Sequence, residues 1–172
     1  MQIRAAAETD IADIQAIYAH HVLNGTGSFE EVPPSVEQMH ARWRGVREDG
    51  WAWFVAEDET GVLGFAYYAR FHHRSAFAHT AENSVYVRDD VRGQGVGKAL
   101  VTAVIDHATA AGFRQMIAAI GDSENTGSIG VHASLGFAQV GMLRAVGFKF
   151  GGWLDLVLMQ RALGPGDSRP PG

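Results

Sequence analysis

A glycine-rich segment in the middle of the chain has the composition of a loop that binds phosphate groups. Its three glycines stand at alternate positions, Gly93, Gly95 and Gly97, so successive backbone N–H groups are left unshielded by side chains. A β-branched and aromatic run precedes them and an amphipathic segment follows, which predicts a strand, a loop and then a helix. The free N–H groups and the positive end of a helix dipole would meet there, and Arg92 and Lys98 add positive charge. The segment therefore predicts a polyphosphate site.

The spacing of the glycines excludes two common polyphosphate motifs. A Walker loop requires a glycine five residues before Gly97, where Arg92 stands, and a hydroxyl residue after the lysine, which is absent. A dinucleotide fingerprint requires a glycine three residues after Gly95, where Lys98 stands. The segment fits Arg/Gln-x-x-Gly-x-Gly instead, and it resembles the loop that binds the pyrophosphate of acyl-CoA in the GNAT superfamily of N-acetyltransferases. The short pattern by itself also suits a helix start that binds no ligand.

Composition narrows the class of protein. The 172 residues are 47% hydrophobic, which predicts one domain, residues 1–163, followed by a disordered Pro/Gly/Ser tail at 164–172. A net charge of −5 argues against a nucleic-acid partner, and without a long apolar run we expect neither a membrane span nor a secretory signal. The absence of cysteine excludes disulfides and thiolate metal sites and is compatible with a cytoplasmic location. We therefore expect a small molecule and a second copy of the chain as partners.

Hydrophobic periodicity and capping residues divide the chain into alternating helices and strands. Four helices are predicted: one from Thr9 or Asp10, one after Ser35, one between the glycine loop and Gly112, and Thr126–Leu135. The predicted strands are Trp51–Glu57, Val62–Ala69, Ala81–Arg88, Gln115–Ile120, Phe137–Leu143 and Trp153–Gln160, the last two separated by a glycine-containing loop. Helices that cross between strands, with hairpins at either end, predict an α/β (α+β) fold whose mixed central β-sheet carries helices on both faces.

The order of these elements agrees with the GNAT fold, in which the strand before the glycine loop and the strand after its helix splay apart as a parallel pair. In this chain those strands are Ala81–Arg88 and Gln115–Ile120. The resemblance implies that the pantetheine arm of acetyl-CoA, the co-substrate, fills the gap with strand-like hydrogen bonds. The residues that it assigns to acetyl-CoA are Val85, Tyr86, Val87, Arg92, Gly93, Gln94, Gly95, Val96, Gly97, Lys98, Asn125 and Ser128.

A second segment, Asn125–Phe137, resembles a further GNAT pattern of Asn, then Ser-Ile, then Leu-Gly-Phe. The resemblance places the amide of Asn125 on the arm of acetyl-CoA, with Ser128 nearby. Where many members have a tyrosine that acts as an acid beside the departing sulfur, this chain has His132. An isolated histidine on a helix is more often part of the packed core. The surrounding motif is what makes His132 a catalytic candidate.

Two longer motifs resemble one subfamily of these enzymes, the phosphinothricin and methionine sulfoximine N-acetyltransferases. They are Thr80–Val87, just before the glycine loop, and Gly141–Asp155, near the end of the chain. The resemblance implies a detoxifying homodimer that acetylates the α-amino group of a small amino-acid analogue, such as methionine sulfoximine, methionine sulfone or phosphinothricin.

The chemistry of amide formation indicates which side chains the reaction needs. An ammonium has no lone pair, so an amino acid must lose a proton before it attacks a thioester, and Glu82 is the candidate base. A backbone N–H near Val85 would stabilise the oxyanion. His132 would protonate the departing thiolate, although the opposite labelling, with His132 as base, also fits the sequence. Without a cysteine nucleophile, direct transfer in a ternary complex is favoured over a covalent enzyme.

The acceptor would be bound by a cation and several aromatic side chains. Arg74 is the cation best placed to form a forked pair with a carboxylate or a phosphinate. Phe77 belongs to the same loop but stands where the phosphinothricin enzymes commonly have a tyrosine. Phe29 would wall the side-chain pocket, and Lys149 and Trp153 would close it.

Three alternatives to this function are a metal site, acetylation of N-termini and a non-catalytic sensor. The pairs His20-His21 and His72-His73 do not predict a metal site, because adjacent side chains diverge and neither pair has a third ligand at a recognised spacing. Acetylation of peptide or protein N-termini would require an open acidic groove. A non-catalytic acyl-CoA sensor would be expected to lack the acid/base pair, and Glu82 and His132 are both present.

Overall fold

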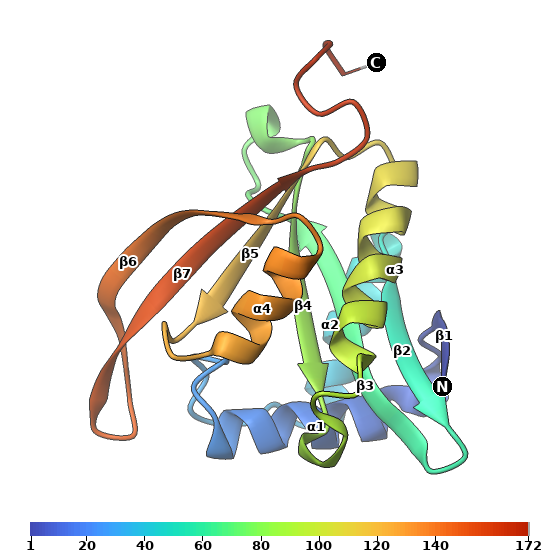
Figure 1. Cartoon of the computed structure of the whole chain (residues 1–172). Helices are drawn as coiled ribbons and strands as arrows, with labels where there is room; N and C mark the ends of the chain where they lie inside the picture. The colour runs from blue at the N-terminus through green and yellow to red at the C-terminus, as the bar shows by residue number, and fades with distance from the viewer. Residues whose placement is uncertain (172) are drawn as a thin grey trace.

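A seven-stranded mixed β-sheet forms the centre of the computed structural model, which describes residues 1–171 (Figure 1). The strand order across the sheet is β1-β2-β3-β4-β5-β7-β6, and every neighbouring pair is antiparallel except β4 and β5. The strands are β1 (Gln2–Ala5), β2 (Trp53–Asp58), β3 (Gly61–Arg70), β4 (Thr80–Val87), β5 (Gln115–Gly121), β6 (Ala138–Lys149) and β7 (Gly152–Ala162).

Helices cover both faces of the sheet, as predicted. The helices are α1 (Ile11–Asn24), α2 (Val36–Glu48), α3 (Val96–Ala110) and α4 (Thr126–Ser134). Alternate residues of a strand point to opposite faces, so Phe65 of β3 packs with α1 and α2, whereas the next residue, Ala66, packs with α3. Figure 1 shows α3 and α4 side by side on the face turned toward the viewer.

The two central parallel strands separate halfway along their length. β4 and β5 pair from Thr80 opposite Gln115 to Asn83 opposite Ala118, and no pair follows. On its other edge β4 stays paired with β3 as far as Val87, and β5 stays paired with β7 as far as Gly121. The predicted splay of a parallel pair is therefore confirmed, and Figure 1 shows the gap between the two arrows, with α4 beside it.

Two parts of the sheet differ from the sequence prediction. The short strand β1 was not predicted, because the four residues Gln2–Ala5 carry no alternating pattern and take their conformation from pairing with β2. The loop predicted between Leu143 and Trp153 is wrong, since β6 continues to Lys149. The pairing shifts at a bulge where Ala145, at φ 52°, donates its N–H to Asp155 Oδ1 at 2.9 Å. The glycines thus mark a bulged strand and a tight hairpin turn.

No helix among residues 1–171 is long and apolar enough to cross a membrane. The buried Leu163 ends the last stretch of core contacts along the chain. The domain boundary there and the disorder of the tail that follows stay predictions, and the last residue of that tail, Gly172, lies outside the described residues.

Candidate active site

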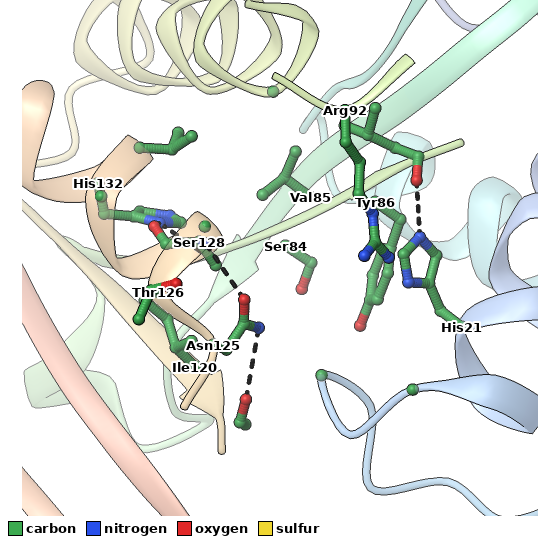
Figure 2. A pocket seen from close by; sticks show the side chains of 18 of the residues that line it. His21, Ser84, Val85, Tyr86, Arg92, Ile120, Asn125, Thr126, Ser128 and His132 are labelled. Carbon is green, nitrogen blue, oxygen red and sulfur yellow. Dashed lines mark hydrogen bonds between the residues drawn. The ribbon is translucent and has the colours of Figure 1, made fainter. Parts of the chain in front are cut away.

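A cavity of about 780 Å³ opens where β4 and β5 part. Its walls are the end of α1 with the loop that follows, the separated ends of the two strands, the glycine loop with the N-terminal turn of α3, and most of α4. Figure 2 shows Ser84, Val85 and Tyr86 on one side and Asn125, Ser128 and His132 on the other. Most of the residues predicted to bind acetyl-CoA therefore line one cavity.

The glycine loop closes one end of this cavity. Gly93 and Gly95 have φ angles of 76° and 83°, in the left-handed region that a side chain disfavours, and Gly95 caps α3. A side chain at either position would meet open space, so the loop presents bare backbone to the cavity. Arg92 contacts the carboxylate of Asp89. Gln94 turns out of the cavity, and its Nε2 donates to the Asp90 carbonyl at 3.4 Å.

The separated part of β4 offers unpaired backbone groups to the gap. The N–H of Arg88 donates to the Leu63 carbonyl of β3 at 2.9 Å. Because backbone groups of alternate residues point to opposite edges of a strand, the N–H groups of Val85 and Val87 point the other way, toward β5. Both residues lie beyond the last β4–β5 pair. The carbonyl of Val87 accepts from His21 Nε2 at 2.8 Å (Figure 2).

The first turn of α4 is tied to the end of β5 through Asn125. Its Oδ1 accepts from the N–H of Ser128 at 3.2 Å, which caps the helix, and its Nδ2 donates to the Gly121 carbonyl at 3.4 Å. Both Asn125 and Ser128 line the cavity. The side chain that was predicted to contact acetyl-CoA thus also holds the strand and the helix together.

His132 is 2% exposed and lies on α4 at the level where β4 and β5 part. Its Nδ1 is 2.8 Å from the Ser128 carbonyl, and its Nε2 is 3.0 Å from Oδ1 of Asn83. The ring packs edge-to-face on Phe137. Burial lowers the pKa of His132, and the Ser128 carbonyl opposes that effect.

Glu82 and His132 lie on different sides of β4. Glu82 directly precedes Asn83, so its side chain points to the opposite face, toward α1 and α2. Its half-buried position raises the pKa of its carboxyl group. No hydrogen bond joins Glu82 to His132 in residues 1–171. The two predicted catalytic residues therefore flank the strand without forming a direct pair.

Phe29 and Lys149 form one cluster with the loop after α1. Lys149 is buried, and its Nζ donates to the carbonyls of Gly25 and Ser28 at 2.9 and 2.8 Å. Burial lowers the pKa of Lys149. The ring of Phe29 lies against Gly147, where a built Cβ would come within 2.6 Å of it. Lys149 thus fixes the loop from within rather than facing open solvent.

The remaining predicted acceptor residues lie elsewhere. Arg74 is exposed in the loop before β4, and the ring of Phe77 in the same loop packs on Phe71. Trp153 is 69% exposed and pairs with Phe148, out of phase with Gly147, so it points to the other face of the hairpin. The five predicted acceptor residues do not lie together at one point of the chain, and their binding role stays a prediction.

Several residues whose side chains form the cavity walls or hold them in place were not predicted from the sequence. His21 was considered only as a metal ligand, yet it binds the edge of β4. Thr26 donates to Asp122 Oδ2 at 2.7 Å, which joins the loop after α1 to the end of β5. Asn83 belongs to the Thr80–Val87 motif, but its contacts were not predicted, because its partners are distant in sequence and only the register of β4 and β5 brings them together.

Comparison with known proteins gives consistent matches over nearly the whole chain. The model of the family described as acetyltransferase (GNAT) domain matches residues 3–158. The chain is 48% identical over 169 residues to a phosphinothricin N-acetyltransferase of Alcaligenes faecalis, covering 98% of this chain and 86% of the relative. It is 43% identical to an L-methionine sulfoximine/L-methionine sulfone acetyltransferase of Pseudomonas paraeruginosa, covering 98% of each.

A solved structure agrees with the fold. The phosphinothricin acetyltransferase of Sinorhizobium meliloti, crystallised in complex with AcCoA, superposes with a TM-score of 0.96 at 42% identity. The match covers 99% of this chain and 92% of that chain. The predicted family and fold are both confirmed.

The contact between Phe29 and Gly147 yields a prediction about stability. Gly147→Ala places a methyl group against the Phe29 ring, which must move, and we expect the free energy of unfolding to fall by about 1–3 kcal/mol. Gly141→Ala, on the same strand with open space around it, is the control and should have little effect. Urea denaturation measures both. An equal loss from Gly147→Ala in a Phe29→Ala background would contradict the contact, because removing the ring should relieve the overlap.

Proposed function

The chain belongs to the GNAT acetyltransferases, and on that premise we propose that it transfers an acetyl group from acetyl-CoA to the α-amino group of a small amino-acid analogue. The observation that carries the proposal is the continuous cavity from the glycine loop to His132, bounded by the open edge of β4. The names of the relatives favour an acceptor of the methionine sulfoximine, methionine sulfone or phosphinothricin type.

The cavity suits acetyl-CoA along its length. The N–H groups at the start of α3, with Arg92 and Lys98, are suited to hold the pyrophosphate. The edge groups of Val85 and Val87 are suited to pair with the amides of the pantetheine arm, and Asn125 and Ser128 lie across from them. When bound, acetyl-CoA supplies an activated acetyl thioester. The residues of the chain align it, take up a proton from the amine and return one to the sulfur.

Glu82 is assigned as the base that deprotonates the ammonium group of the acceptor, directly or through water. Its raised pKa, caused by burial, brings its proton affinity closer to that of a neutral-pH base. The N–H groups of Val85 and Val87 both face the gap without a strand partner, and that of Val85, nearer the last β4–β5 pair, is assigned to the oxyanion. No cysteine is present, and transfer is direct, within a ternary complex.

His132 is assigned to the donor side of the reaction, at the level where β4 and β5 part. Arg74 is assigned to the acidic group of the acceptor, and Phe29, Phe77, Lys149 and Trp153 to the walls of its pocket. The position of Arg74 supports this role, because its side chain is exposed and positively charged and it lies in the loop that precedes β4, the strand of Glu82. Lys149 would act by holding the Phe29 loop in place.

A homodimer is also proposed, through the hairpin formed by β6 and β7. Large apolar side chains are exposed along this hairpin, among them Val146 at 53%, Phe148 at 56% and Trp153 at 69%. Contiguous exposed apolar side chains of this kind mark association surfaces.

The experiment that tests the function incubates the purified protein with acetyl-CoA and one acceptor at a time, and follows the release of free thiol. The acceptors are methionine sulfoximine, methionine sulfone, phosphinothricin, the ordinary amino acids and short peptides. Saturable release with one of the analogues supports the proposal. Release with peptides alone would favour acetylation of N-termini. Binding of acetyl-CoA without any release would favour a sensor, and either result would overturn the proposed acceptor.

The assignment of Glu82 predicts a specific pH dependence. The carboxylate is the active form, so kcat/KM should rise with pH through a pKa above the ordinary glutamate range and level off above it. Glu82→Gln should remove that limb and lower kcat by about 10²–10⁴, while isothermal titration still detects acetyl-CoA binding. Glu59→Gln, in the exposed β2–β3 turn, is the control. Full turnover in Glu82→Gln would show that another group takes the proton.

The proposed dimer predicts a change of mass on charge substitution. Val146→Glu places a charge in the apolar surface of the hairpin, and burying it would be costly, so the variant should be monomeric where the parent is dimeric. Light scattering after size exclusion measures the mass. Val32→Glu, at an exposed valine in the loop before α2, should leave the mass unchanged. A monomeric parent protein would refute the dimer.

A further inference from the structure

The carbonyl groups along the open edge of β4 are not equally available to a ligand. The N–H of Arg88 points to β3, and a trans peptide directs its C=O group the opposite way, so the carbonyl of Val87 points into the gap. The carbonyl of Val85, two residues earlier, points the same way. Both residues lie beyond the last β4–β5 pair and line the cavity. The backbone of β4 therefore directs two hydrogen-bond acceptors into the gap.

His21, at the end of α1, occupies one of these two acceptors. Its Nε2 lies 2.8 Å from the carbonyl oxygen of Val87 (Figure 2). That oxygen only accepts, so Nε2 carries the hydrogen. Burial lowers the pKa of His21, and a neutral ring with its one hydrogen on Nε2 satisfies the contact. The carbonyl of Val87 thus has a donor before any ligand binds, whereas that of Val85 has none.

Packing and a second contact from α1 hold the imidazole in this position. The ring centroid of His21 lies 5.4 Å from that of Tyr86, which in turn packs edge-to-face on Tyr18 at 4.9 Å. The neighbouring His20 binds the carboxylate of Asp89 through Nε2 at 2.7 Å. The two adjacent histidines therefore hold the end of β4 at two places. Moving the ring of His21 away from Val87 would require it to leave the ring of Tyr86.

The pairing of a ligand with this edge has consequences for the position of its reactive end. The pantetheine arm carries an amide beside the thioester, and the N–H of that amide needs an acceptor. If the arm moved by one strand repeat toward the glycine loop, this N–H would face the carbonyl of Val87 instead of that of Val85. The thioester would then lie about 6–7 Å from its place beside the N–H of Val85. An occupied carbonyl at Val87 disfavours that shift.

We propose that His21 is a positioning residue that sets the register of the pantetheine arm along β4. By occupying the carbonyl of Val87, it leaves the carbonyl of Val85 as the acceptor for the amide beside the thioester. The acetyl group is then held at the level where β4 and β5 part, next to the N–H assigned to the oxyanion. The inference rests on the proposed function for the identity of the ligand.

Carbonyl resonances respond to hydrogen bonding, so NMR on protein labelled with ¹³C at the valine carbonyls tests the inference. The signals of Val85 and Val87 are those that Val85→Ile and Val87→Ile remove. Without acceptor, adding acetyl-CoA should move the signal of Val85, which gains a donor, and leave that of Val87 in place. Any other pattern in the parent protein saturated with acetyl-CoA overturns the inference without a variant of His21.

Two variants separate the hydrogen bond of His21 from its packing. His21→Phe keeps a ring against Tyr86 but has no donor, so the Val87 signal should now move when acetyl-CoA binds. His21→Gln retains an N–H for the Val87 carbonyl and should behave as the parent protein does. His40→Phe is the control, because this half-buried histidine of α2 packs on Trp43 outside the cavity. A Val87 signal that stays in place in His21→Phe would contradict the assignment.

Turnover distinguishes this role from a purely structural one. In His21→Phe two registers of similar energy leave at most about half of the bound molecules aligned, so kcat should fall about 2-fold or more. The Kd of acetyl-CoA, measured by isothermal titration, should be unchanged or lower, because an acceptor has been freed. A raised Kd with unchanged kcat would indicate a structural role and overturn the inference.

The failure of the proposed function would look different. It would show as acetyl-CoA that does not bind the parent protein, or as binding without turnover of any acceptor. In the second case the carbonyl signals would still decide the role of His21. In the first, the response of the Val87 signal to His21→Phe without ligand would still decide whether His21 occupies that carbonyl.

Discussion

Beyond Asn83 and Ala118, two neighbouring parallel strands leave each other while each keeps its partner on the outer edge. The inner edges then carry amide groups without strand partners, and a buried unpaired amide costs about 1–3 kcal/mol. These amide groups face the cavity, where water or a bound molecule with hydrogen-bonding groups of its own can pair with them. Because β3 and β7 hold the outer edges, the opening is built into the sheet itself.

Contacts from distant parts of the chain keep the gap from closing. The end of β5 is held by Asn125 through the Gly121 carbonyl and by Thr26 through Asp122. The loop that carries Thr26 is itself fixed by the buried ammonium group of Lys149. A buried charge is tolerated because two carbonyl oxygens compensate for its lost hydration. The shape of the cavity thus depends on β6, a strand that lines none of it.

The sequence predicted those parts of the site whose chemistry is local. The alternate glycines, the run before them and the amphipathic segment after them predicted the strand, the glycine loop and the helix that starts there, and the resemblance to the GNAT fold predicted the splayed pair. The length of β6 was missed because Ala145 and Gly147 lie at a bulge, which resembles a loop in sequence. The contacts of Asn83 and the true contacts of Lys149 were beyond prediction, since both depend on register between segments that lie at least 34 residues apart.

Successive side chains of a β-strand point to opposite faces of the sheet. One short segment can therefore lie beside both the amine and acetyl-CoA in the proposed reaction. Glu82 and Asn83 are adjacent, so their side chains point to opposite faces of β4. The first faces the α1 and α2 side, where the carboxylate meets the amine in the proposed mechanism, and the second faces α4, where it binds His132. A direct proton relay between Glu82 and His132 would have to cross the strand itself. The geometry instead favours two separate proton transfers, one on each face, with the acetyl group passing between them at the point where the strands divide.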